Sequence, residues 1–273
     1  MRTDLPKYAK PPVVEVAMSV QFDELADFKL VHFGQLWNYY RDRYPRTENQ
    51  PPLGSIIELF GKQGPERATL SVESGYPVGR CWYKSDDALR LVQIQPDRFI
   101  LNWRKLDTDV EYPSYATLRE LFVKELNQFL VFVSEQELGD FTPTQCELTY
   151  VNHVPSRDGW SSTDELSNVL ATWSNEPSRG FVLPPIEDLR FQWQYQFQEL
   201  SKPLGRLHVH VHSAVRTSDR TPILVLQLTA RGAPLGGDVG GVLAFSDRAH
   251  EWIVHAFTAV TTERMHKLWE RYR

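Results

Sequence analysis

Residues 188–198 read DLRFQWQYQFQ, and apolar and polar side chains alternate along the stretch. In a β-strand, its five apolar residues would point to one side, and its arginine and four glutamines to the other. Antiparallel sheets commonly bury one face against a core and leave the other face polar. The stretch therefore predicts an antiparallel sheet with one apolar and one polar face.

The same alternation predicts strands on both sides of this stretch. We expect strands at residues 14–22, 55–60, 69–72, 80–84, 89–95 and 98–104, and then at residues 145–154, 188–198, 206–215 and 223–229. Apolar residues that recur three or four positions apart predict helices at residues 32–44, 115–135, 163–173 and 248–272. Residues 236–241 are rich in glycine and read as a mobile loop, with Ser246 or Asp247 as the cap of the last helix.

These elements occur twice in the same order. When Val14 is laid on Cys146, the predicted strands and helices of the two halves coincide without gaps. Several matches in one register favour a duplicated β-α-β-β-β-α unit. We therefore expect an α+β fold of two tandem units with antiparallel sheets, each covered by a long C-terminal helix. The first repeat would comprise residues 1–140 and the second residues 141–273, packed closely on the first.

The composition limits the environment and the partners of the protein. Of its residues, 41% are hydrophobic and 24% are charged, as in ordinary globular proteins. The net charge of -5 disfavours general binding to nucleic acid, because phosphate backbones attract basic surfaces. Cys81 and Cys146 exclude a disulfide-rich scaffold and a thiolate zinc cluster. Residues 1–10 lack the apolar stretch of a signal peptide and no window resembles a membrane span, so we expect a cytoplasmic protein.

Five segments together point to a known family. They are PPVVEVAMSVQF at residues 11–22, LVQIQPDRFILNWRK at 91–105, YPSYATLRELF at 112–122, CELTYVNHV at 146–154 and AHEWIVHAFTAVTTERMHKLWERY at 249–272. In this order they resemble a sporadically distributed prokaryotic protein family, a conserved domain of unknown function. The resemblance spans nearly the whole chain and implies no catalytic residue or cofactor. The scattered distribution implies genes that move by horizontal transfer, such as those of mobile or defence-type systems.

Polar and aromatic residues on the predicted strands are candidates for binding a macromolecule. One group lies on a single hairpin and comprises Gln93, Gln95, Asn102, Trp103 and Arg104. A second group comprises Arg190, Gln192 and Gln194, on the strand at residues 188–198. Amides both donate and accept hydrogen bonds, so such a face can pair with the polar groups of a partner. The alternative is an ordinary solvent-facing sheet.

The C-terminus and one further strand carry the remaining candidates. Trp269, Arg271 and Tyr272 combine the residue types that anchor protein interfaces, although a final helix also needs aromatic residues for its core. His208, His210 and His212 alternate with valines and would share one strand face. Two such histidines could chelate a metal ion with a third ligand from elsewhere. The alternative is a solvated strand face.

No catalytic or cofactor motif is present in the sequence. It contains no G-x-S-x-G, no H-E-x-x-H and no Walker-type loop, and the glycines at residues 236–241 are not followed by a Lys-Ser/Thr pair. We therefore favour a non-enzymatic macromolecule-binding module of a mobile or defence-type system, with a protein partner or a second copy of the chain. One alternative is a ligand- or metal-binding α+β domain or an enzyme. The other is a nucleic-acid-binding module.

Overall fold

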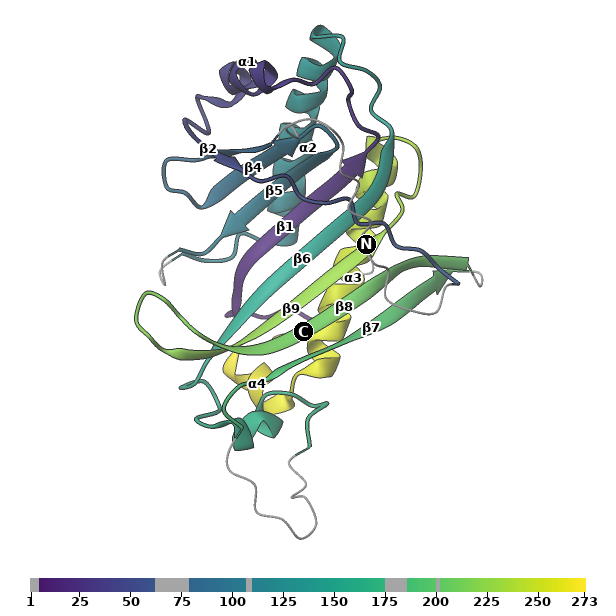
Figure 1. Ribbon diagram of the computed structural model, residues 1–273. Helices are drawn as coiled ribbons and strands as arrows, with labels where there is room; N and C mark the ends of the chain where they lie inside the picture. The colour runs from purple at the N-terminus through teal and green to yellow at the C-terminus, as the bar shows by residue number, and fades with distance from the viewer. Residues whose placement is uncertain (1–4, 62–78, 107–109, 175–185, 200–201) are drawn as a thin grey trace.

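The computed structural model describes residues 5–61, 79–106, 110–174, 186–199 and 202–273. Within these residues, nine strands form one antiparallel sheet in the order β2-β3-β4-β5-β1-β6-β9-β8-β7 (Figure 1). The strands are β1 (Val13–Phe22), β2 (Arg46–Gln50), β3 (Arg80–Lys84), β4 (Arg90–Gln95), β5 (Arg98–Arg104), β6 (Pro143–Pro155), β7 (Arg190–Glu199), β8 (Lys202–Val215) and β9 (Pro222–Gly232). The helices are α1 (Leu30–Tyr40), α2 (Tyr115–Glu135), α3 (Val239–Val260) and α4 (Glu263–Leu268), with a 3₁₀ helix, η1, at Thr163–Asn168.

The sheet is continuous because β1 and β6 pair with each other at its centre. In their register, Met18 lies opposite Leu148 and Val20 lies opposite Cys146. All four side chains are buried and belong to the hydrophobic core. The alternating apolar residues of these two strands therefore point to the same side, where one layer of helices can cover them.

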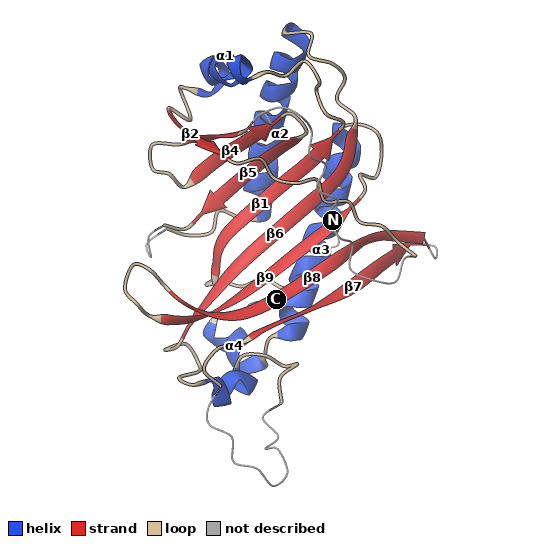
Figure 2. Ribbon diagram, in the orientation of Figure 1, coloured by secondary structure: helices blue, strands red, loops and turns tan. Residues whose placement is uncertain are grey.

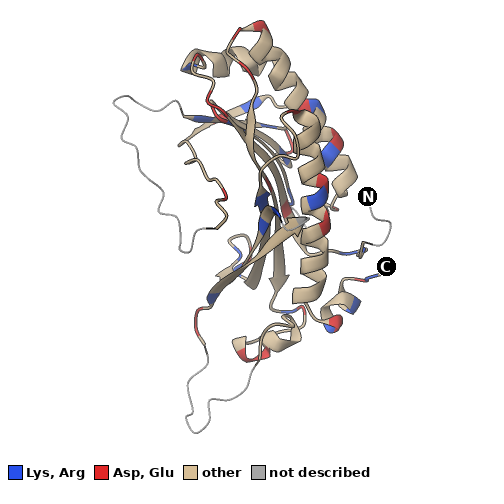
Figure 3. Ribbon diagram, turned by 90° about the vertical axis from the view of Figure 1, so that its right-hand side faces the viewer, with Lys and Arg blue, Asp and Glu red and all other residues tan. Residues whose placement is uncertain are grey.

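Two long helices, α2 and α3, lie side by side against one face of the sheet (Figures 2 and 3). The buried residues of α2 recur three and four positions apart, as Phe122, Leu126, Phe129 and Val133 show. Ser114 caps α2 by accepting a hydrogen bond from the Thr117 amide. The two helices are also joined directly, because Arg119 of α2 forms an ion pair with Asp247 of α3.

The prediction of two tandem β-α-β-β-β-α units is wrong. The structure has one nine-stranded sheet in place of two sheets. The helix expected at residues 163–173 is reduced to the 3₁₀ helix η1, so the described residues of the second half contain no helix that matches α1. The antiparallel α+β character of the chain is confirmed.

Three further expectations about single elements need correction. Residues 55–60 are not a strand but part of an irregular segment that crosses the face of the sheet opposite α2 and α3 (Figure 3). The last long helix begins at Val239, so Gly240 and Gly241 belong to its first turn and Asp238 is its cap. Ser246 and Asp247 therefore lie inside the helix. The strand expected at residues 69–72 falls outside the described residues.

The first turn of α3 explains the glycines that suggested a loop. The Asp238 side chain accepts a hydrogen bond from the Gly241 amide, 2.8 Å away. A Cβ on Gly241 would lie 2.4 Å from the carbonyl oxygen of Gly236, so the close approach of these two residues requires glycine.

Among the described residues, no helix combines the length and the apolar character that crossing a lipid bilayer requires.

Candidate functional site

The face of the sheet opposite α2 and α3 is lined by polar side chains, and we call it the polar face. It includes Gln93 and Gln95 of β4, Arg98 and Asn102 of β5, Gln21 of β1, Gln145, Glu147 and Thr149 of β6, Gln227, Thr229 and Arg231 of β9, and Arg206 and His208 of β8. Each alternates along its strand with residues of the hydrophobic core. The face therefore follows from the period-two pattern of the strands.

Residues 51–61, which we call the crossing segment, lie across the polar face and are bound there by their main chain. The Gln95 amide pairs with both sides of Leu53, accepting from its N–H and donating to its carbonyl, each at 3.0 Å. Gln21 does the same with Ile56, at 3.1 Å and 2.8 Å. Glutamine side chains thus take the place that a neighbouring strand would have in a sheet.

Two further contacts hold the crossing segment near its middle. Arg98 donates to the Gly54 carbonyl at 2.8 Å and to the Gln21 side chain at 2.6 Å. Gln145 accepts a hydrogen bond from the Glu58 amide at 2.9 Å. Gln21, Arg98 and Gln145 are all buried. The polar face is therefore desolvated where the segment lies on it.

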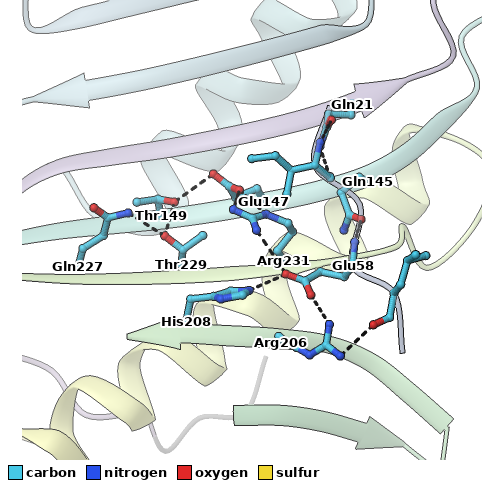
Figure 4. A network of polar contacts seen from close by, with 12 residues as sticks. Gln21, Glu58, Gln145, Glu147, Thr149, Arg206, His208, Gln227, Thr229 and Arg231 are labelled. Atoms are coloured by element: carbon cyan, nitrogen blue, oxygen red, sulfur yellow. Dashed lines mark hydrogen bonds and ion pairs between the residues drawn. The ribbon is translucent and has the colours of Figure 1, made fainter. Parts of the chain in front are cut away.

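The side chain of Glu58 reaches a group of basic side chains on the polar face (Figure 4). Arg206 and His208 each contact one of its carboxylate oxygens at 2.5 Å, and Arg231 lies 3.3 Å away. Arg231 also bridges to Glu147 at 2.5 Å. Only 7% of the Glu58 side chain is exposed. Three basic groups from β8 and β9 thus surround one buried carboxylate.

The electrostatics of this cluster favour the charged form of Glu58. Burial alone would raise the pKa of its carboxyl group, but the hydrogen bonds from His208 and Arg206 and the charge of Arg231 outweigh it. Together they lower the pKa from 4.5 to about 2. The end of the segment adds two contacts, because Arg206 also donates to the Leu59 carbonyl and lies 4.7 Å from the centre of the Phe60 ring.

The hairpin predicted from the sequence forms a polar network at the other end of the face. The Gln93 side chain accepts from Arg80 at 2.7 Å and from Trp82 at 2.8 Å, and it donates to Asn102 at 2.7 Å. Asn102 in turn donates to Glu15 at 2.6 Å. Gln93 and Asn102 are buried, so their amides are largely occupied within the protein.

Trp103 and Arg104, the last two residues of that hairpin group, point to opposite faces of the sheet. Trp103 points to the opposite face, where it is buried in the core next to Tyr112. Arg104 stays on the polar side, donates to the Ala88 carbonyl at 3.3 Å and lies 5.9 Å from the centre of the Trp82 ring. The structure therefore brings four of the five hairpin candidates onto one face.

The second group of candidates lies exposed at the opposite edge of the polar face. Arg190, Gln192 and Gln194 of β7 are exposed, and in the register with β8 they lie opposite His212, His210 and His208. At the C-terminus, Tyr272 has 68% of its surface exposed and Arg271 is also exposed, whereas Trp269 is buried in the core. The Trp269 ring lies beside the Phe257 ring there, with ring centres 5.0 Å apart and a tilt of 32°.

The three histidines share one face of β8, as their alternation with valines indicates. The rings of His208 and His210 lie 6.4 Å apart, and His208 is engaged with Glu58. Across the described ranges, no group of three or more His, Cys, Asp or Glu side chains is arranged to hold a metal ion. The geometry therefore adds no support to the metal hypothesis.

Comparisons with known proteins give no further guide. No family model, curated protein or solved structure matches this chain. The resemblance to a prokaryotic family stays a prediction, and function has to be argued from the site itself.

The sequence analysis selected Gln95 and His208 but missed the other residues that bind the crossing segment. Gln21 and Gln145 occupy polar positions in strands whose alternation was recognised, so the glutamine pattern that selected Gln93 and Gln95 could also have selected them. Glu58, Arg206 and Arg231 carried no such signal. They come from segments far apart in the sequence, and only the pairing of β8 with β9 brings the two arginines together.

Proposed function

We propose that this chain is a non-enzymatic protein-binding module that holds an extended, acidic segment of a partner protein on the polar face of its sheet. The partner segment would lie along β7 and β8, beside the crossing segment. There the exposed side chains of Arg190, Gln192 and Gln194 form the edge of the polar face.

The observation that carries this proposal is the way in which the crossing segment is bound. Gln95 and Gln21 each pair with both the N–H and the carbonyl of one residue. Contacts with the main chain do not depend on the side chains of the bound segment. The same chemistry therefore suits an extended segment from another protein, and Gln192 and Gln194 offer further amides for it.

The charges on β7 and β8 favour an acidic partner. Glu58 is bound by an arginine and a histidine of β8 together with Arg231. Arg190 lies directly opposite His212 in the register of β7 with β8. This pair offers a partner carboxylate the same residue types that bind Glu58, and charge-assisted hydrogen bonds of this kind are strong.

The proposal is tested by selecting peptides from a displayed random library on the purified full-length protein. We expect enriched peptides to be rich in Asp and Glu. Binding of a selected peptide should weaken about tenfold in the triple variant Arg190→Ala, Gln192→Ala, Gln194→Ala, as expected for the loss of charge-assisted hydrogen bonds.

The matched control replaces Lys124 and Asn127 by alanine, because both are exposed on α2, on the other side of the sheet. This variant should bind the selected peptides as the wild type does. Failure to enrich acidic peptides, or equal weakening in both variants, would contradict a binding site on β7 and β8. The connection to mobile or defence-type systems stays a prediction that the neighbouring genes would test.

A further inference from the structure

We propose that the cavity between the sheet and helices α2 and α3 binds a small organic carboxylate with a flat apolar body. The cavity has a volume of about 700 Å³, within the size range of small-molecule sites. It lies on the helix-covered side of the sheet, so this second site is separate from the polar face.

The wall of the cavity is mostly apolar and partly flat. Val13, Leu228 and Ile253 line it from β1, β9 and α3. The Tyr115 ring stacks on the His250 imidazole with ring centres 4.0 Å apart and a tilt of 6°. A flat aromatic ligand fits against such a surface by offset stacking and by burying its own apolar area.

A fixed chain of polar groups lines the inner end of the cavity. The Tyr112 and Tyr150 hydroxyl groups share a hydrogen bond of 2.9 Å, and Tyr150 contacts the Nδ1 of His250 at 3.1 Å. Within the described residues, the Nε2 of His250 has no hydrogen-bond partner. Burial lowers the pKa of His250 to about 4, so the ring is neutral at pH 7. Neutral imidazole then leaves one ring nitrogen to pair with a ligand.

Neighbouring contacts fix these groups in position. The Tyr115 hydroxyl donates to Asp247 at 2.7 Å, and Arg119 donates to the same carboxylate. Both Asp247 oxygens are therefore occupied by protein donors. The site is built before a ligand arrives, which lowers the entropic cost of binding.

The charges that line the cavity favour an anion. Lys7, Lys10 and Lys105 contribute three positive charges, against one negative charge from Glu111. Lys10 is paired with Glu270. Among the described residues, neither Lys7 nor Lys105 has an ion-pair partner. Lys7 is exposed, whereas Lys105 is half-buried. One half-buried lysine, Lys105, suits a carboxylate better than a phosphate monoester, because the larger charge of a phosphate needs more donors.

The two ends of the chain close one side of the cavity. The Ala9 and Lys10 amides donate to the carbonyls of Glu270 and Trp269, both at 3.1 Å, and the Tyr272 amide donates to the Lys7 carbonyl at 3.0 Å. Tyr272 itself lines the cavity. Tyr272, which the sequence indicated as a binding candidate, would therefore contact a molecule bound in this cavity.

The test measures binding of 2-naphthoate and of its neutral counterpart 2-naphthalenemethanol by calorimetry. We expect the wild type to bind 2-naphthoate with a stoichiometry of about one, and more tightly than the alcohol. Lys105→Gln should weaken naphthoate binding about tenfold and leave alcohol binding unchanged, because only the anion uses the lysine charge. Lys202→Gln, on the exposed end of β8, is the matched control and should bind both compounds as the wild type does.

A second variant tests the location of the site. Val254→Trp should fill the cavity and abolish binding of both compounds, whereas Val131→Trp, at an exposed position of α2, should not. Circular dichroism and thermal unfolding confirm that each variant is folded. The proposal is overturned if the wild type binds neither compound, if it shows no preference for the anion, or if folded Val254→Trp still binds.

Discussion

Glu58 is the one acidic residue of the crossing segment, and its carboxylate meets three basic side chains of the sheet. Glu58→Gln keeps the shape of the side chain but leaves Arg206, His208 and Arg231 without a countercharge from the segment. We expect the variant to lower the free energy of unfolding by about 2 kcal/mol, as for the loss of a buried hydrogen-bonded charge. Urea unfolding at pH 7 measures this, and Glu48→Gln, on an exposed pair with Lys84, should cost less.

The same residue gives the stability a defined dependence on pH. Because the pKa of Glu58 falls from 4.5 to about 2 on folding, the charged form stabilises the native state above pH 4.5. This contribution is lost as the pH falls from 4.5 through 2. The wild type should therefore lose more stability than Glu58→Gln between pH 5 and pH 2. If the free energies of unfolding of the two proteins fell equally between pH 5 and pH 2, the carboxylate would not be bound as described.

His250 should make the stability of the protein depend on pH in a second, higher pH range. Burial lowers its pKa from 6.5 to about 4, so the unfolded chain takes up a proton before the folded one does. Stability contributed by the neutral ring is complete above pH 6.5 and is lost as the pH falls towards 4. His250→Phe keeps a ring against Tyr115 but should not show this loss, as thermal unfolding at pH 7 and pH 5 would measure. An NMR titration that gives His250 an ordinary pKa would contradict the prediction.

Single residues also show what the sequence pattern could and could not indicate. The alternation along β4 and β5 was sufficient to place Gln93, Gln95 and Asn102 on one face. It equally implied that Trp103 points away from them, which its place in the core bears out. Nothing in the pattern indicated that the face would be covered by residues 51–61, because contacts between distant segments leave no local periodicity.

Among the larger elements, the crossing segment depends on glutamine side chains for its attachment. Gln95→Ala removes both hydrogen bonds of Leu53, so the Leu53 amide should exchange its hydrogen about tenfold faster. The Ile56 amide, which is bound by Gln21, should change less. Hydrogen exchange followed by NMR resolves the two sites, and Gln196→Ala on exposed β7 serves as the control. Unchanged exchange at Leu53 would mean that the segment is held by other contacts.

Elements with a strong apolar period were predictable, and those defined by close contacts were not. Residues Tyr115–Glu135 form a helix with the predicted bounds, because the apolar stripe of α2 is long and regular. The start of α3 was placed too late, since glycine is unfavourable in helices in general but is required where Gly241 meets Gly236. Strand β2, with the sequence RTENQ, has no apolar alternation and is defined only by its pairing with β3.

The molecule taken as one body differs most from what the sequence indicated. Each half has strands that could form a sheet of its own, and local patterns cannot show whether two such sheets join. The joining contact is the pairing of β1 with β6, whose facing residues Met18 and Leu148 are far apart in the sequence. Because β1 and β6 pair with each other, neither strand has an unpaired edge at the centre of the molecule. This favours a single sheet over two separate sheets.

This arrangement predicts that the protein unfolds in one cooperative transition. A division into units at residues 1–140 and 141–273 would allow two transitions, but β1 and β6 share hydrogen bonds across that boundary, and Arg119 and Asp247 link the helices above them. Leu126→Ala in α2 and Leu224→Ala in β9 each remove a buried side chain and should cost about 3 kcal/mol. Both should shift the same calorimetric transition, although they lie in different halves.

Val131→Ala and Leu268→Ala provide the matched controls, because both side chains are about half exposed and their loss should shift the transition little. Agreement between the calorimetric and van't Hoff enthalpies would establish that the transition involves the whole sheet. If Leu126→Ala instead moved one of two resolved transitions and Leu224→Ala the other, the pairing of β1 with β6 would be too weak to couple the halves. The polar face would then consist of two independent surfaces, and Glu58 could not rely on a rigid frame to bring Arg206 and Arg231 to it.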